Sequence, residues 1–201
     1  RRCVDGEVPV GKLNSIAVVS NNGTANKIDS FLRRDIEYRA EHDPTSGYTS
    51  ATLTITLTNT APSSGYPDYV IGSEFLDLPL GTNRTLLSVY TALNVVDIRL
   101  DGQVVDRTTD SEQGWNVSTI GLDLAPGEER VVVITLDGVI DAPDDRYELV
   151  VRPQPMAADD SIQAEVVSAD GDGQSDAVLV RYAGTLTRRA VLVGSTATPV
   201  R

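Results

Sequence analysis

The clearest pattern in the chain is an alternation of apolar and hydroxyl-bearing side chains across residues 50–59. Leu53, Ile55 and Leu57 alternate with threonines at positions 52, 54, 56 and 58. Successive side chains of a β-strand point to opposite faces of its sheet, so this pattern predicts a strand with a buried aliphatic row and a solvated threonine row. A strand buried on one face only is typical of antiparallel sheets.

Two hairpins are predicted from turn dipeptides between β-rich runs. Asp101-Gly102 divides residues 94–106, and this pair readily adopts the positive φ angles of a type I′ turn. Pro126-Gly127 suits the two central positions of a type II turn, between a strand that ends near Leu124 and one that starts near Arg130.

Further short β-rich runs indicate an all-β protein. They span residues 15–20, 35–41, 84–90, 147–152, 162–168, 177–183 and 185–193. The one helix-compatible window, residues 24–41, also alternates from Asp35 onward, so residues 26–33 stay unassigned. Val, Thr and Ile far outnumber Glu, Gln, Lys and Met, which favours strands. We therefore predict an antiparallel, immunoglobulin-like β-sandwich with extra strands and little helix.

The expected domain organisation is one sandwich preceded by an arm. Residues 1–34 are expected to form an N-terminal arm that continues from an upstream region, and residues 35–201 to form the sandwich. Residues 155–201 are either an added hairpin or a separate subdomain. Loops are predicted at 60–69, 108–115, 141–146 and 168–176, and none has the length or composition of an interdomain linker.

The net charge limits the classes of partner. The 201 residues carry 29 acidic and 17 basic side chains, a formal charge of −12, which repels phosphate backbones and anionic lipid headgroups. The longest aliphatic run, Val131 to Ile134, is far shorter than the roughly 20 apolar residues that span a bilayer. The first residues also lack the apolar region of a signal peptide. Neither nucleic acid nor direct membrane insertion is expected.

Few residues carry catalytic or metal-binding potential. The single cysteine, Cys3, and the single histidine, His42, exclude an internal disulfide and multi-cysteine or His-rich metal sites. No nucleophile elbow or phosphate-binding loop occurs, so we assign no catalytic residue, cofactor or metal. Asp170, Asp172 and Asp176 could offer oxygen ligands to Ca²⁺, but the loop lacks a complete ligand set, and a plain acidic hairpin loop is the alternative.

Three aromatic residues are the remaining candidates for function or packing. Tyr66 and Tyr69 flank Pro67 in one loop, where two rings on a rigid support could bind a sugar or a peptide. The alternative is a loop that closes the end of the sandwich. Trp115, the only tryptophan, is expected to anchor the core.

Several peptides, in order, resemble a known family. They include TLTNTAPSSGYPDYVIG, GTNRTLLSVYTAL, GWNVSTIGLDLAPGEE and YELVVRPQP, within residues 14–155. This stretch resembles the C-terminal β-rich region of domain-of-unknown-function family 4012, a group of actinobacterial envelope proteins. The resemblance implies a parent protein with an N-terminal transmembrane helix and an extracytoplasmic body at the cell surface, of which this chain is the C-terminal part. It supplies no catalytic residues.

Two functions are compatible with these observations. The first is a non-catalytic extracytoplasmic module, a spacer or interaction domain, whose partner is a cell-envelope glycan or another envelope protein. The second is part of an enzyme that acts on cell-envelope polysaccharide. A cleft containing Tyr66, Tyr69 and His42 together would favour the enzyme, whereas scattered positions would favour the module.

Overall fold

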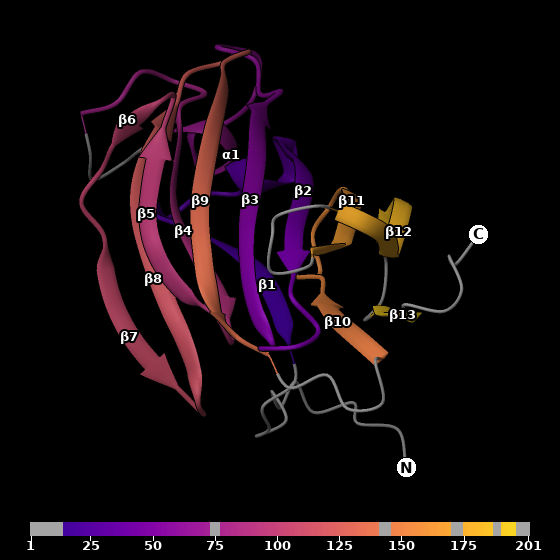
Figure 1. Cartoon of the computed structure of the whole chain (residues 1–201). Coiled ribbons are helices and arrows are strands. Elements are labelled where there is room, and N and C mark those ends of the chain that lie inside the picture. Colours follow the sequence, from indigo (N-terminus) through magenta and orange to yellow (C-terminus); the bar gives the residue numbers. More distant parts are fainter. Residues whose placement is uncertain (1–13, 73–76, 141–145, 170–174, 187–189, 196–201) are drawn as a thin grey trace.

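The computed structural model describes residues 14–72, 77–140, 146–169, 175–186 and 190–195, and it consists of two sheets facing each other (Figure 1). Sheet A has the strand order β13 (Ala190–Ser195), β10 (Arg146–Arg152), β1 (Ser15–Asn22), β4 (Asn83–Thr91), β8 (Trp115–Leu124), β7 (Thr108–Glu112). Sheet B has the order β12 (Ser175–Leu186), β11 (Asp160–Ala169), β2 (Leu32–His42), β3 (Tyr48–Asn59), β9 (Glu129–Val139), β5 (Asn94–Leu100), β6 (Gln103–Val104). The all-β prediction is confirmed.

Both sheets are mixed, which corrects the prediction of antiparallel pairing throughout. β1 pairs with β10 in parallel, and β2 pairs with β11 in parallel. Parallel neighbours need a long crossover connection, and here most of the chain lies between the two members of each pair. No turn dipeptide indicates a parallel pairing, so this pairing could not be predicted from local sequence patterns.

The two parallel pairs bring the early and late parts of the chain into the same sheets. β1 is an interior strand of sheet A, between β10 and β4, so the range expected as an N-terminal arm, residues 1–34, contains a strand with partners on both sides. β11 and β12 extend sheet B beyond β2, and β13 pairs with β10 in sheet A.

The main hydrophobic core lies between the sheets. Leu53, Ile55 and Leu57 of β3 are fully buried in it, together with Ile16 of sheet A and Val132 of sheet B. The predicted aliphatic row is therefore confirmed. The threonines at positions 52, 54, 56 and 58 lie on the outer face of sheet B, where Thr52 is exposed and the other three are half-buried.

Both predicted turns are confirmed. Asp101 and Gly102 have φ angles of 49° and 82°, as a type I′ turn requires, and they join β5 to β6. Gly127 has a φ of 75°, and the amide of Glu128 donates to the carbonyl of Ala125 at 3.0 Å, which closes the turn between β8 and β9.

Other predicted boundaries differ from the structure. The range 108–115, expected as a loop, contains β7, whose five residues are all exposed and therefore give no alternating pattern. The range 185–193, expected as one strand, is divided between the end of β12 and β13. Residues 141–145 and 170–174 of two predicted loops lie outside the described residues.

Helical structure is limited to two single turns. A 3₁₀ turn, η1, spans Ile28–Phe31 in the region that the sequence left unassigned, and α1 spans Asp68–Ile71 in the loop expected at 60–69. Within the described ranges, no helix has the length and apolar character needed to cross a membrane.

Candidate functional site

The two tyrosines predicted as binding residues lie on the surface at one end of the sandwich. Tyr66 is 50% exposed and Tyr69 is 66% exposed. The Tyr66 ring contacts Phe31 edge to face, with ring centroids 5.4 Å apart and an interplanar angle of 74°. Leu80, from the next loop, is also largely exposed. We refer to Tyr66, Tyr69 and Leu80 as the end patch.

A small buried cluster is connected to the end patch through Phe31. Ile28, Ala61 and Ile71 form this cluster, and Phe31, which contacts Tyr66, and Val70 pack against them. The amide of Gly81 donates to the carbonyl of Ile71 at 2.8 Å, which joins the two loops. The patch is thus a surface of the folded body.

Asn59 fixes this end of the molecule to the turn between β8 and β9. Its buried side-chain amide donates to the carbonyls of Gly81, Leu124 and Ala125 at 2.7 to 3.1 Å, and its side-chain oxygen accepts from the amide of Ala61. One side chain therefore satisfies backbone groups from three connections.

His42 lies in the interior at the other end of β2. Its side chain is 1% exposed, its Nδ1 is 2.9 Å from the hydroxyl of Thr49, and its ring lies edge to face with Tyr147. Burial lowers the pKa of His42, partly opposed by the nearby carboxylate of Asp43. The imidazole is therefore held in its neutral form.

The polar groups around His42 belong to the core. Burial raises the pKa of Tyr38 to about 12, and it raises that of Tyr147 well above its ordinary value. The amide nitrogen of Asn14 donates to the hydroxyl of Tyr147. These groups carry no charge near neutral pH, and they are closed to a substrate.

A buried arginine of sheet B forms an ion pair within that sheet and hydrogen bonds to sheet A. The guanidinium of Arg34 on β2 donates to both carboxylate oxygens of Asp160 on β11 at 2.7 and 2.8 Å, and to the carbonyl of Val18 and the hydroxyl of Ser20 on β1. Gln154, in the Arg-Pro-Gln-Pro peptide, accepts from Arg34 and pairs with the backbone of Ser20. With its donors satisfied in this way, the cluster has a structural role.

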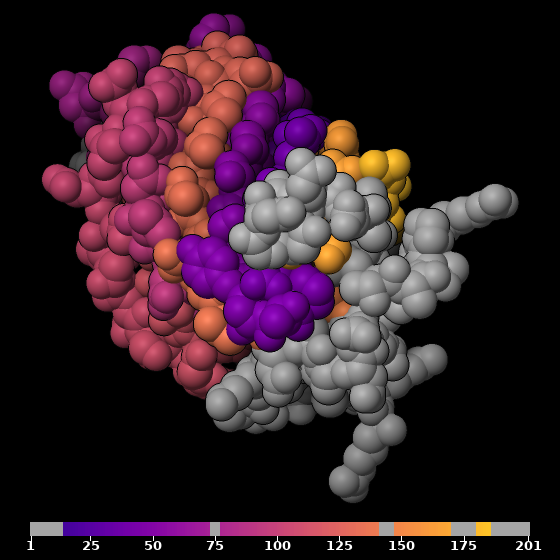
Figure 2. All heavy atoms as spheres, viewed as in Figure 1, coloured from indigo at the N-terminus to yellow at the C-terminus, as the bar shows by residue number. Residues whose placement is uncertain are grey.

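A groove lies on the outer face of sheet B. It has a volume of about 460 Å³ and is open to solvent. Four strands contribute its principal polar side chains: Arg39 and Glu41 from β2, Ser50 and Thr52 from β3, Thr135 from β9 and Glu165 from β11. We call this the sheet B groove. Figure 2 shows this side of the molecule, with β3 and β9 next to each other.

Sequence reasoning did not identify the sheet B groove. Its residues are far apart in the chain and meet only because β11, β2, β3 and β9 are neighbours in that order. The threonine row of β3 was the one available signal, since it predicted a polar outer face.

The other residues singled out in the sequence are Trp115, Cys3 and the aspartates of the acidic loop. Trp115 is buried as predicted, but it lies on the face of β8 opposite to Ile120 and Leu122, outside the core between the sheets, and the Arg152 guanidinium lies 5.8 Å from its ring centre. Cys3 and most of the acidic loop that begins near Asp170 lie outside the described residues. Within the described part of the chain, no cluster of three or more His, Cys, Asp or Glu side chains could hold a metal ion.

Comparison with known proteins gives no family. No family model matches the sequence, and no curated protein matches it. Among solved structures, a candidate nutrient-binding protein from Legionella pneumophila aligns over 90% of this chain and 70% of its own, with 7% identity and a TM-score of 0.49. Yeast LTA4 hydrolase aligns over 97% of this chain and 31% of its own, with 9% identity and a TM-score of 0.46. An M1 zinc metallopeptidase from Deinococcus radiodurans aligns over 82% and 39%, with 13% identity and a TM-score of 0.37.

These similarities are too distant to carry an argument about function. The chain spans well under half of the hydrolase and of the metallopeptidase. The candidate sites are therefore judged on their own geometry.

Proposed function

We propose that this chain is a non-catalytic, extracytoplasmic interaction module of a membrane-anchored actinobacterial cell-envelope protein. In this proposal the anchor lies elsewhere in the parent protein, and the partner is an envelope glycan or another envelope protein. The chain serves, like an immunoglobulin-like domain, as a two-sheet scaffold that presents a binding loop at one end. The end patch is the observation that carries the proposal.

The chemistry of the end patch supports binding. Tyr66 and Tyr69 are exposed, and the Tyr66 ring is held against Phe31, which packs on a small buried cluster, so this ring loses little conformational freedom when a partner covers it. Exposed aromatic side chains contribute a large share of the binding energy at protein interfaces, and their hydroxyl groups add hydrogen bonds.

The position of His42 also supports a module over a part of an enzyme. Phe31, which contacts Tyr66, immediately precedes β2, whereas His42 is the last of its eleven residues. An extended strand of that length covers about 35 Å. The cleft that the enzyme alternative requires, with Tyr66, Tyr69 and His42 together, does not form from residues at opposite ends of a strand.

The experiment is a pull-down of actinobacterial cell-wall fractions by the purified chain. The double variant Tyr66→Ala/Tyr69→Ala should retain several-fold less material than the wild type. Leu86→Ala, which removes an exposed apolar side chain from the outer face of sheet A, is the matched control and should behave as wild type. Circular dichroism checks that each variant is folded. If the double variant retains as much material as the wild type, the end patch is not the binding surface.

A further inference from the structure

We propose that the sheet B groove is a second binding site, and that it takes a saccharide with protonated amino groups. The inference rests on the proposed function only in taking envelope glycan as the class of partner. The second site contains none of the residues of the end patch, so an experiment can refute the proposal for one site without affecting the proposal for the other.

The groove arises from the order of short and long side chains across sheet B. Thr52 of β3 lies opposite Arg39 on one side and opposite Thr135 on the other, and Arg39 in turn lies opposite Glu165. The hydroxyl-bearing residues in the middle are short, and the charged residues of β2 and β11 are long. The row therefore has a low polar floor and a charged wall along one side.

The floor offers hydrogen-bonding groups that the protein does not use. The hydroxyls of Ser50, Thr52 and Thr135 make no hydrogen bond to any described residue. Each hydroxyl can donate one hydrogen bond and accept others, which matches the mixed donor and acceptor character of sugar hydroxyls. The backbone amides and carbonyls beneath them are engaged in the ladders of sheet B, so an extended peptide cannot pair with this face as it would with a sheet edge.

The charges of the wall favour a cationic ligand. Arg39 is paired with Glu37 at 2.6 Å, and Glu165 is paired with Arg181 at 2.5 Å, whereas Glu41 makes no ion pair or hydrogen bond with the described residues. The groove thus keeps one unneutralised carboxylate beside the hydroxyl floor. A carboxylate accepts charge-assisted hydrogen bonds from an ammonium group and repels uronic acids and phosphates.

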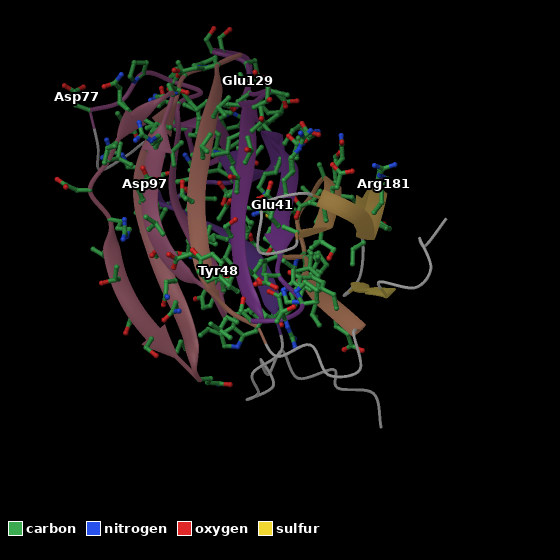
Figure 3. All side chains as sticks on the ribbon, viewed as in Figure 1. Glu41, Tyr48, Asp77, Asp97, Glu129 and Arg181 are labelled. Atoms are coloured by element: carbon green, nitrogen blue, oxygen red, sulfur yellow. The ribbon has the colours of Figure 1, made fainter. Side chains whose placement is uncertain are left out.

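An aromatic ring lies beside the groove on the same face. Tyr48 is 48% exposed and precedes Ser50 by two positions on β3, so both side chains project from the outer face of sheet B. Its flat ring can cover the apolar C–H face of a sugar. Figure 3 shows Tyr48 and Glu41 toward one end of the sheet, and Glu129 toward the opposite end of β9. A volume of about 460 Å³ lies within the range of small-molecule sites and leaves room for a short oligosaccharide.

Calorimetric titration of the whole chain tests the proposal. The probes are the fully de-N-acetylated β-1,4-glucosamine tetramer, its N-acetylated counterpart and tetralysine, at mildly acidic pH where the amines are protonated. The glucosamine tetramer should bind in the millimolar to micromolar range, and the other two should bind at least about tenfold more weakly, because each lacks either the charge or the hydroxyl pattern.

Variants assign the binding to the groove. Glu41→Gln should weaken binding of the glucosamine tetramer about tenfold, as expected for the loss of one charge-assisted hydrogen bond, and Thr52→Val should weaken it by a smaller factor. Glu129→Gln removes the same charge from the far end of the same face and should leave the affinity unchanged. The Tyr66→Ala/Tyr69→Ala variant should also bind as the wild type does, which separates this site from the end patch.

Four results would overturn the inference. These are no binding of the glucosamine tetramer by the wild type, equal binding of tetralysine, equal binding of the N-acetylated tetramer, and equal losses in Glu41→Gln and Glu129→Gln. The second and fourth would show that the acidic surface attracts cations without a site. Circular dichroism of each variant shows whether a loss of binding is due to unfolding.

Discussion

Ile55 and Thr54 are neighbours on β3 whose side chains point in opposite directions. Ile55 is fully buried between the sheets, whereas Thr54 is half-buried on the outer face of sheet B. Ile55→Ala should lower the free energy of unfolding by about 2 to 5 kcal/mol, and Thr54→Ala by less than about 1 kcal/mol. Urea denaturation of both variants measures the difference. Similar losses in the two would contradict the assignment of the faces.

His42 gives the stability a defined dependence on pH. Burial lowers the pKa of its imidazole below the ordinary value of 6.5. Below that value the unfolded chain binds a proton that the folded chain does not, so stability should decline as the pH falls from about 6.5 and continue to decline until the lower, folded pKa is passed. In His42→Gln this part of the pH dependence should be absent. Thermal melting of both proteins over this range is the measurement.

The comparison that decides this prediction is the slope of Tm against pH. The carboxylates titrate at lower pH, so they contribute little to the slope just below 6.5. A wild-type slope in that interval equal to that of the variant would show that His42 does not remain neutral in the fold.

At the residue scale, the sequence predicted which side chains of β3 are buried because alternation admits one burial pattern. It did not predict that His42 lies in the interior. That position depends on Thr49 and Tyr147, and Tyr147 comes from a strand of the other sheet. The residues of the sheet B groove could not be predicted from the sequence either, because their proximity depends on the order of the strands in the sheet.

At the scale of elements, Asn59 is the link between β3 and the turn that joins β8 to β9. Asn59→Ala would leave the carbonyls of Gly81, Leu124 and Ala125 without their common donor. We expect a loss of about 1 to 3 kcal/mol in the free energy of unfolding. Asn94→Ala, at an exposed asparagine of the same sheet, is the control and should cost much less. Chemical denaturation of the two variants tests this, and comparable losses would refute the role of Asn59.

Elements that local chemistry specifies could be predicted, and elements that depend on distant partners could not. The hairpins at Asp101-Gly102 and Pro126-Gly127 follow from the φ angles that these residues accept. β7 was missed because an exposed edge strand of polar residues has the same composition as a loop. β10 and β11 pair in parallel with β1 and β2, which lie more than a hundred positions earlier in the chain. No short sequence pattern predicts such a pairing.

At the scale of the whole molecule, the last strands should be required for stability. β11 covers one edge of β2 and supplies Asp160, the buried partner of Arg34. Loss of one member of a buried ion pair costs about 3 to 5 kcal/mol, a large part of the 5 to 15 kcal/mol that usually stabilises a domain. A chain that ends at residue 155 should therefore lack a cooperative unfolding transition. Urea titration followed by tryptophan fluorescence would show it.

A truncated chain with the same midpoint as the full chain would instead identify residues 156–201 as a separable subdomain. Asp160→Asn in the full chain provides an intermediate case. It keeps β11 and removes only the charge that Arg34 requires, so it should reduce stability without abolishing the transition.

The parallel pairing of β1 with β10 also governs how the chain can fold. Asn14, beside β1, contacts Tyr147 of β10 across 133 positions of the chain. Arg34 of β2 contacts Asp160 of β11, the other parallel pair, across 126 positions. Closing such long loops costs entropy before the contacts repay it, so folding is expected to be slow, on the order of milliseconds to seconds. During synthesis, β1 and β2 emerge long before their parallel neighbours. Each strand then has an unpaired edge until more than a hundred further residues have been made, an interval in which a chaperone that shields strand edges can act.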